Sequence, residues 1–204
     1  MKGRLITIEG TDCAGKSTQA RLLAESLAAS GRPSLLTREP GGAPGAEALR
    51  GFLLANTIAL DPLAEAMIHF AARTDHATRT LRPAHAAGLT IVCDRFFDST
   101  MAYQGYGQGA DRAAIAALIR LLDLTPDLTF VLDLPPEEEQ RRREQRGRTA
   151  DRYERLGPTF LERVRQGFQT IAKTHSERCI LIDASPSPSE VQAHLFALTQ
   201  ARLA

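Results

Sequence analysis

Five short apolar runs, separated by longer segments with helical periodicity, constrain the fold of this chain more than any other feature. They are almost continuously apolar and rich in Leu, Ile and Val, as is typical of parallel strands that helices bury on both faces. The runs occupy residues 4–10 (RLITIEG), 33–39, 89–95, 128–134 and 179–184. The sequence therefore predicts a doubly wound α/β fold with a five-stranded parallel sheet.

The intervening segments show the spacing of amphipathic helices. Leu22, Leu23 and Leu27 share one face of the first segment, and Asp61 provides an N-cap signal for the second. We expect Pro83 to kink or end that second helix. The predicted helices span residues 16–30, 61–87, 111–124, 157–176 and 187–203.

Length and composition predict one domain covering residues 1–204. The chain has 204 residues and is 43% hydrophobic, and it contains neither a long linker nor an internal repeat. It has no apolar run near the roughly 20 residues that a membrane span requires and no secretion-like start, so we expect a cytoplasmic protein. A net charge of +1 gives no reason to expect a nucleic acid or a membrane as partner.

The three cysteines lack the spacing of a disulfide framework or a zinc site. Cys93 and Cys179 lie in apolar runs and are expected to be small buried side chains. Cys13 lies in a loop before a helix, where a thiol can become reactive, but we expect it to fill a permissive position.

The stretch GTDCAGKST at residues 10–18 has the pattern G-x-x-x-x-G-K-[ST], between a strand and a helix. Glycines at these positions let backbone N–H groups surround a triphosphate, the lysine reaches its β and γ phosphates, and the hydroxyl binds Mg²⁺. Only three of the 25 basic residues are lysine, so this lysine is a distinctive choice. The predicted ATP site comprises Gly10, Thr11, Asp12, Cys13, Ala14, Gly15, Lys16, Ser17 and Thr18.

Other residues narrow the class of enzyme. The only asparagine, Asn56, is followed by Thr57, so the Asn-Lys-x-Asp element that reads guanine in GTPases is missing. Asp94 and Arg95 end the third strand, where parallel sheets present ligand-binding groups; they suit Mg²⁺ and a phosphate, although a strand-end salt bridge is the alternative.

Two further stretches are candidates for substrate contacts. Residues 37–50 are rich in Gly and Pro and carry Arg38 and Arg50 at the mouth of the sheet, although an ordinary surface loop is the alternative. Residues 141–152 contain six arginines, and Gly147 interrupts their helix. This arginine-rich segment predicts a lid over the triphosphate, and a solvated charged helix is the alternative.

Five stretches of the chain resemble, in their order, the signatures of bacterial thymidylate kinase. They are IEGTDCAGKSTQ, TREPGG, AEALR, DRFFDSTMAYQG and RGRTADRYE. The resemblance extends to about residue 185. It implies transfer of the γ-phosphoryl group of ATP, with Mg²⁺, to dTMP, which gives dTDP for dTTP synthesis. It also implies a homodimer and a short lid at about residues 141–155.

The resemblance also implies roles for individual residues. Arg50 and Arg95 would hold the dTMP phosphate, with Arg38 and Pro40 in the adjoining loop. At the base, Arg73 would donate to thymine O4, Thr100 and Gln104 would bond the ring, and Tyr103 would exclude a ribose 2′-hydroxyl. The implied metal residues are Ser17, Asp94, Asp12 and Glu154, with Asp151 nearby.

For catalysis, the resemblance implies Lys16, Arg95 and Asp12 together with one lid arginine. The third variable position of the loop is Cys13 and not arginine, so the catalytic arginine is expected in the lid. Our first choice is Arg148, with Arg143, Arg146 and Arg152 as alternatives. Arg143 and Arg146 are also expected to contact ATP.

The chain departs from the family at the position that stacks on thymine. Phenylalanine is usual there, whereas this chain has His69 followed by Phe70. The spacing to Pro83 and Asp94 favours His69 at the stacking position. Two alternatives concern Phe70: it could take this role after a local shift of the chain, or it could belong to the core.

Two other functions stay open from the residues. A deoxynucleoside kinase would need a general base, which Asp12 or Asp94 could supply. A nucleotide-binding module without transfer chemistry is the alternative from another class. The five histidines suggest no catalytic triad, and we expect His76 and His85 on helix surfaces.

Overall fold

The computed structural model describes residues 3–55, 58–147 and 152–203, except for the side chain of Arg146. Its sheet has five parallel strands, as the sequence predicts, and their order is β2-β3-β1-β4-β5. The strands are β1 (Arg4–Gly10), β2 (Ser34–Arg38), β3 (Thr90–Asp94), β4 (Leu128–Asp133) and β5 (Cys179–Asp183). Each differs from its predicted bounds by at most one residue at either end.

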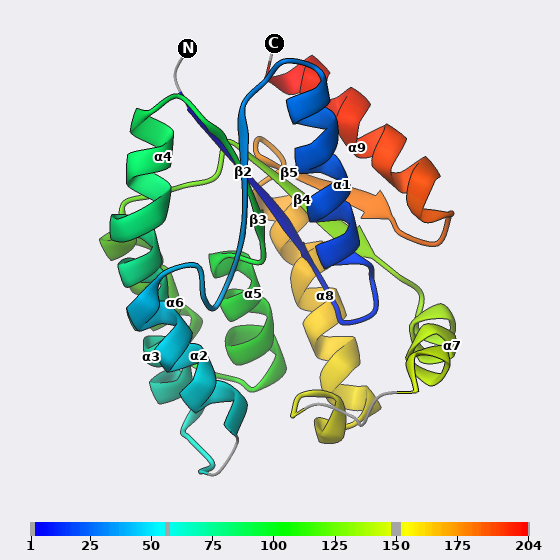
Figure 1. Ribbon diagram of the computed structural model, residues 1–204. Helices are drawn as coiled ribbons and strands as arrows, with labels where there is room; N and C mark the ends of the chain where they lie inside the picture. Colours follow the sequence, from blue (N-terminus) through cyan, green and yellow to red (C-terminus); the bar gives the residue numbers. More distant parts are fainter. Residues whose placement is uncertain (1–2, 56–57, 148–151, 204) are drawn as a thin grey trace.

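Helices connect the strands and cover both faces of the sheet (Figure 1). The longer ones are α1 (Lys16–Ala29), α2 (Pro44–Ala55), α3 (Pro62–His76), α6 (Arg112–Leu122), α7 (Pro136–Arg146), α8 (Pro158–Thr174) and α9 (Pro188–Arg202). Shorter segments are η1 (Ala77–Leu81), α4 (Arg82–Ala86), α5 (Phe97–Thr100), η2 (Met101–Gly107) and η3 (Glu154–Leu156). No helix in the described ranges is long and apolar enough to cross a membrane.

Helical segments also form in two stretches where the sequence predicted none. The stretch interpreted as a Gly- and Pro-rich loop becomes α2 from Pro44 onward, with proline in its first turn and Glu47 near its N-terminus, both favourable there. The segment after β3 forms α5 and η2 although it carries no clear helical periodicity.

The predicted interruption of the helix over residues 61–87 is confirmed. Asp61 accepts from the N–H groups of Leu63 and Ala64, and α3 ends at His76. A π-helical segment, η1, precedes Pro83, and the helix resumes as α4. A proline lacks an N–H donor and crowds the carbonyl four residues earlier, so a widened turn accommodates it.

The apolar core lies on both faces of β1, whose side chains alternate between them. Ile6 and Ile8 pack with Leu23 and Leu27 of α1 and with side chains of α9 on one face. Leu5 packs on the other face with side chains of α3, α5 and α6. The five side chains named here from β1 and α1 are at most 1% exposed, so hydrophobic burial fixes the strand between its two helix layers.

The sheet order places a crevice at the carboxyl end of β1. This strand lies between β3 and β4, and the chain leaves it toward β2 on one side and later crosses to β4 on the other. In such sheets, ligands bind at the carboxyl ends of the strands where the connections diverge. The predicted phosphate loop starts there at Gly10, and Asp94 ends the neighbouring strand level with Ile8.

Candidate active site

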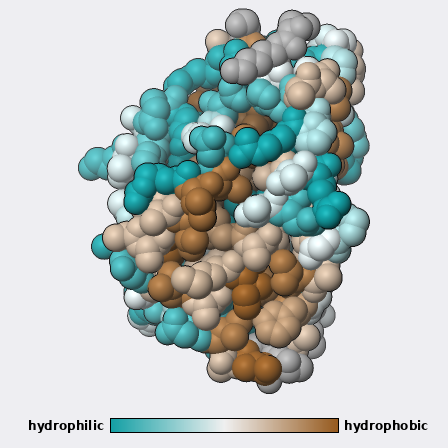
Figure 2. Space-filling view, turned by 90° about the vertical axis from the view of Figure 1, so that its left-hand side faces the viewer, coloured by the Kyte–Doolittle hydropathy of each residue, from teal (hydrophilic) through white to brown (hydrophobic). Residues whose placement is uncertain are grey.

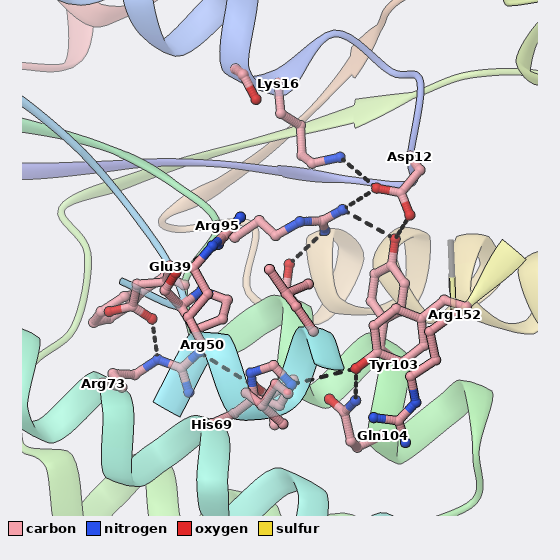
Figure 3. Close-up of a pocket in the computed structure, with 18 of the residues that line it drawn as sticks. Asp12, Lys16, Glu39, Arg50, His69, Arg73, Arg95, Tyr103, Gln104 and Arg152 are labelled. Atoms are coloured by element: carbon pink, nitrogen blue, oxygen red, sulfur yellow. Dashed lines mark hydrogen bonds and ion pairs between the residues drawn. The ribbon is translucent and has the colours of Figure 1, made fainter. Parts of the chain in front are cut away.

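A cavity of about 650 Å³ opens at this edge of the sheet. Its walls come from the β1–α1 loop, the segment after β2, α3, the segment after β3, and the region before η3 (Figure 3). Lys16 and Asp12 lie at one end of the cavity, whereas His69 and Gln104 lie at the other. We call these the phosphate end and the base end.

The phosphate loop has the backbone geometry that its sequence requires. Gly10 has φ 135°, and a Cβ there would lie 2.4 Å from the carbonyl oxygen of Leu132. Gly15 is left-handed at the N-terminus of α1, and no side chain caps that helix end. Its first N–H groups therefore remain available to an anion. Cys13, buried and also at positive φ, lines the cavity.

Lys16 is buried beneath this loop with its ammonium group held in place. Its Nζ donates to the carbonyl oxygen of Thr11 at 2.6 Å and lies 3.7 Å from Oδ1 of Asp12. Burial, assisted by the positive charge of Arg95, lowers the pKa of Lys16 to about 8. A bound phosphate would supply the negative charge that this buried cation lacks.

Ser17 and Asp94 form the pair of oxygen ligands that Mg²⁺ would need. The Ser17 hydroxyl donates to Oδ2 of Asp94 at 2.5 Å. Oδ1 of Asp94 is buried and has no hydrogen-bond partner within the described part of the chain. A buried carboxylate oxygen without a partner next to a hydroxyl suits a hard cation, so these residues fit Mg²⁺. Asp12 and Glu154 instead face cations of their own chain.

Hydrogen bonds fix both the main chain next to Arg95 and its guanidinium group. Its φ of 69° is left-handed, and the N–H of the next residue, Phe96, donates to Oε1 of Glu9 at 2.7 Å. Nη1 of Arg95 donates to Ser99, whose hydroxyl lies 2.5 Å from Oε2 of Glu9. Nη2 donates to Oδ1 of Asp12 at 2.6 Å. The side chain therefore reaches the phosphate end in a fixed orientation.

The electrostatics of this end follow from those contacts. Burial alone would raise the pKa of Asp12, but the charges of Arg95 and Lys16 lower it to about 2. Burial and the negative charge of Asp98 raise the pKa of Glu9 to about 8. The aspartate that faces the cavity is therefore ionised, whereas the glutamic acid below it is neutral at neutral pH.

Arg50 and Arg38, both predicted to contact substrate, lie in different surroundings. Arg50 lines the cavity and donates from Nη1 to the carbonyl oxygen of Pro40 at 2.7 Å. Burial and the charge of Arg38 lower the pKa of Arg50. Arg38 is exposed and points to Glu47 at 3.1 Å, away from the lining of the cavity.

Arg73 dominates one wall of the base end. It is 3% exposed, donates from Nε to Oε2 of Glu39 at 2.6 Å, and lies 3.3 Å from the hydroxyl of Thr100. Its Nη1 is buried without a hydrogen-bond partner in the described residues. An unpartnered buried donor is costly, so this atom marks a place for a ligand acceptor. The guanidinium also stacks over the ring of Phe70 at 4.6 Å.

His69 and Phe70 lie in different surroundings. His69 lines the cavity, whereas Phe70 is 5% exposed and belongs to the core between β3 and α3. Burial, then the positive charge of Arg73, lowers the pKa of His69 to about 3. His69 is therefore a neutral ring at the position where the family places phenylalanine.

Tyr103 and Gln104, both predicted at the base and sugar, lie on η2 and line the cavity. The Tyr103 hydroxyl donates to Oδ2 of Asp12 at 3.3 Å, so it joins the two ends of the cavity. The carboxamide nitrogen of Gln104 donates to Glu65 and to the hydroxyl of Tyr153. Thr100 is buried beside Arg73 on the same wall.

The lid is only partly described by the structure. Arg148 and Asp151 lie outside the described residues, as does the side chain of Arg146. Gly147 ends α7, as predicted, and its conformation is left-handed. Arg143 pairs with Glu139 and with Glu154, the latter at 3.4 Å, and does not line the cavity. Arg152 does line it and pairs with Glu65.

A second, smaller cavity of about 60 Å³ adjoins the phosphate loop. It is lined by Ala14, Gly15 and Thr18 on one side and by Arg142 and the segment before α9 on the other. Arg142 donates to the carbonyl oxygens of Ala184 and Ser185, which fixes it against that segment.

The sequence analysis missed several residues of the site and misplaced one. His76 was expected on a helix surface, which is wrong: it is fully buried, 2.9 Å from Glu39 and 2.8 Å from Thr37. Glu39 and Glu65 are buried acids that hold site residues. Glu39 lies in the TREPGG stretch but was given no role, and Glu65 lies in none of the stretches singled out for function. Tyr153 and Arg155 also line the cavity. Only the DRYER stretch near the lid gave a signal for these two.

Comparisons with known proteins agree with this geometry. A family model described as thymidylate kinase matches residues 8–195. A thymidylate kinase of Gluconobacter oxydans is 48% identical over 96% of this chain and 93% of its own length, and one of Caulobacter vibrioides is 46% identical over 99% and 98%. The crystal structure of thymidylate kinase from Ehrlichia chaffeensis superposes with a TM-score of 0.80 at 35% identity, covering 98% of this chain and 99% of that one.

Proposed function

The chain belongs to the thymidylate kinase family, an ATP-dependent family of nucleoside monophosphate kinases, and we propose how its residues transfer the γ-phosphoryl group of ATP to dTMP. One observation carries the proposal. Lys16 of the triphosphate loop and Arg95 of the acceptor side face the same oxygen of Asp12, at 3.7 Å and 2.6 Å. Donor and acceptor phosphates that replace this carboxylate contact would meet between the two cations.

The acceptor is a phosphate and not a hydroxyl. Arg50 and Arg95 provide guanidinium groups suited to a phosphate, which is already ionised near neutral pH and needs no general base. A nucleoside acceptor would need one, and Asp12, with a pKa of about 2 and an ion pair to Arg95, is poorly suited to removing a proton. These features favour dTMP over thymidine as the acceptor.

Mg²⁺ would be held by Ser17 and Asp94. When bound, the metal would supply positive charge that neutralises the phosphate oxygens during transfer. The chain supplies the rest of the charge: Lys16 lies under the triphosphate loop and Arg95 orients the acceptor. The Ser17 hydroxyl and the Asp94 carboxylate already lie side by side, so the two oxygens would be available to one cation.

The base end would hold thymine. The unpartnered Nη1 of Arg73 is placed to donate to the O4 atom, and His69 offers a neutral ring to the face of the base. Tyr103 would crowd a ribose 2′-hydroxyl. Loss of the thymine methyl removes only apolar contact, worth about 1–3 kcal/mol, so dUMP should be a poorer but detectable substrate.

Residues 141–155 would act as a lid within a single domain of residues 1–204. Arg148 stays our first choice for the catalytic lid arginine, and Arg143, Arg146 and Arg152 stay as alternatives. Arg152 lines the cavity whereas Arg143 is held by two glutamates, so Arg152 is the alternative with more support. An Arg148→Ala variant that loses turnover but binds dTMP would support the first choice, and unchanged turnover would move the role to a neighbour.

We also propose a cytoplasmic homodimer. Figure 2 faces the side of the molecule that carries α2, α3, α4 and α6 and shows hydrophobic residues gathered across it. Met67 of α3 and Leu121 of α6 are exposed by 52% and 81%, which is unusual for large apolar side chains. Light scattering should give twice the chain mass, and a Met67→Glu, Leu121→Glu double variant should shift it to one chain mass. A native protein with the mass of one chain would contradict the dimer.

The test of the reaction is ADP release from Mg-ATP by the purified protein in the presence of dTMP, dUMP, UMP, dCMP, AMP or thymidine. We expect a strong preference for dTMP. Preference for thymidine would favour a nucleoside kinase. The absence of acceptor-dependent release would favour a binding module.

A further inference from the structure

We propose that Glu65 is a positioning residue that orients the carboxamide of Gln104 so that its oxygen faces the base of the acceptor nucleotide. The enzyme would thereby select a pyrimidine with a ring N–H over one with an unprotonated ring nitrogen. This inference rests on the proposed function, since it places the base beside Gln104.

The carboxamide nitrogen of Gln104 faces Glu65 and Tyr153. Gln104 is 1% exposed, and its Nε2 donates to Oε1 of Glu65 at 2.8 Å and to the hydroxyl oxygen of Tyr153 at 3.0 Å. Both contacts need a hydrogen on the amide atom, and only the nitrogen of a carboxamide carries hydrogens. The nitrogen is therefore held on the side of Glu65 and Tyr153.

The orientation of the amide is set by its partners and is therefore not arbitrary. Glu65 is completely buried on α3 and receives hydrogen bonds from Gln104, Tyr153 and Arg152. A carboxylate in this position only accepts. The single hydrogen of the Tyr153 hydroxyl goes to Glu65 at 2.5 Å, so its oxygen is the acceptor for Gln104. Both neighbours of the amide require its nitrogen, and turning it over would oppose oxygen to oxygen twice.

The oxygen of the amide is consequently left for the cavity. Gln104 lines the base end, and Figure 3 shows its carboxamide next to His69. His69 and Gln104 both approach the hydroxyl of Tyr153, at 3.4 Å and 3.0 Å, so the two side chains border one space. A ligand placed there meets a hydrogen-bond acceptor.

A hydrogen-bond acceptor at this place distinguishes thymine and uracil from cytosine. Thymine and uracil carry a hydrogen on N3 and satisfy the acceptor, whereas N3 of cytosine is itself an acceptor. Arg73 adds the complementary test, because its unpartnered Nη1 is a donor that suits O4 and not the amino group of cytosine. A site that leaves buried polar groups unpaired rejects the wrong ligand strongly.

The experiment compares native enzyme with Glu65→Gln, using kcat/KM for dTMP, dUMP and dCMP. Glutamine has the same size but can donate to the oxygen of Gln104, which permits the amide to turn. We expect the preference for dTMP over dCMP to fall by about tenfold or more, while the preference for dTMP over dUMP stays within about twofold. An unchanged dCMP preference, or a parallel fall of both ratios, overturns the proposal.

Two further variants separate orientation from a general disturbance of the lid. Tyr153→Phe keeps the contact between Glu65 and Gln104 and is expected to keep most of the discrimination against dCMP. The exchanged pair Glu65→Gln, Gln104→Glu again presents an acceptor to the base and should recover discrimination lost in Glu65→Gln. Equal losses in Tyr153→Phe and Glu65→Gln, or no recovery in the exchanged pair, count against the proposal.

The native enzyme in the same assay tests the proposed function. If it forms no dTDP, that function fails and this inference fails with it; if it forms dTDP and Glu65→Gln keeps its discrimination, only this inference fails. Should Glu65→Gln not fold, solution NMR of the native protein decides. The carboxamide protons of Gln104 should exchange slowly with solvent before nucleotide is added, and fast exchange would overturn the assignment.

Discussion

The two ends of the main cavity are built by different means. At the phosphate end, the loop after β1 and the residue after β3 take unusual backbone conformations, with Gly10, Cys13, Gly15 and Arg95 at positive φ. At the base end, side chains from α3, η2 and the region before η3 meet across long sequence separations and are held by buried acids.

This difference suggests that the phosphate end governs phosphoryl transfer, whereas the base end governs the choice of acceptor. The phosphate end offers cations and backbone donors, which any nucleotide polyphosphate can use. The base end offers polar atoms whose orientation depends on Glu39 and Glu65. Damage to the phosphate end should therefore reduce turnover with every acceptor, whereas damage to the base end should change the ranking of acceptors.

The largest effect is expected from Lys16→Ala at the phosphate end. The variant loses the buried cation that faces the triphosphate, and we expect kcat to fall by about 10²–10³-fold with dTMP and dUMP alike. ADP release measures it, and equilibrium binding of dTMP should persist. The matched control is Lys173→Ala on the exposed side of α8. Full activity in Lys16→Ala would place the donor phosphates elsewhere.

The next largest effect is expected when one of two arginines is removed. Both were predicted to contact substrate. Arg95→Ala removes a guanidinium with contacts to Asp12, Gly10 and Ser99, and we expect kcat/KM for dTMP to fall by about 100-fold. Arg38→Ala removes only an exposed pair with Glu47 and should change it by less than about threefold. A similar loss of kcat/KM in both variants would show that Arg38 also contacts the substrate.

The buried acid below the phosphate end, Glu9, should make the free energy of unfolding depend on pH. Glu9 has a pKa raised from 4.5 to about 8, so the folded protein keeps a proton that the unfolded chain releases above about pH 4.5. Its stabilising contribution is complete below pH 4.5 and is lost as pH rises to about 8. Relative to Glu9→Gln, the native free energy of unfolding should fall by on the order of 1 kcal/mol per pH unit in that window.

Urea unfolding of both proteins at several pH values measures this difference. Glutamine keeps an acceptor for the N–H of Phe96 and has no titrating proton, so it is the matched variant. A difference in free energy that stays constant between pH 5 and pH 8 would show that Glu9 is already ionised in the folded state.

The smallest effect is expected from the ring at the base end. His69→Phe enlarges the apolar surface that meets the base, and we expect KM for dTMP to fall about two- to fivefold with kcat unchanged. Phe70→His is the matched exchange: it places a polar ring in the core and should lower stability by about 2–4 kcal/mol. A lower KM in the second variant, and not in the first, would assign the stacking position to residue 70.

Much of the phosphate end could be predicted from the sequence because its geometry is local. The spacing of Gly10, Gly15, Lys16 and Ser17 predicts a strand, a loop and a helix, and those elements are present. The strand bounds followed from continuous apolar runs, since burial on both faces leaves a clear pattern. The helix α2 was missed because Gly and Pro dominate the start of its stretch, although Pro44 occupies a favourable first-turn position.

The base end depended on the tertiary structure. His76 looks like a surface residue in its helix, yet folding places it against Glu39 of a different segment, where both are buried. Glu65 resembles a first-turn acid of α3, and only the approach of η2 and Tyr153 turns it into the shared acceptor for three side chains. The sequence by itself determined the strands, the triphosphate loop and the family, because these rest on spacing along the chain. The partners of the buried acids were decided by the tertiary structure, because a carboxylate's role depends on which donors folding brings within hydrogen-bond distance.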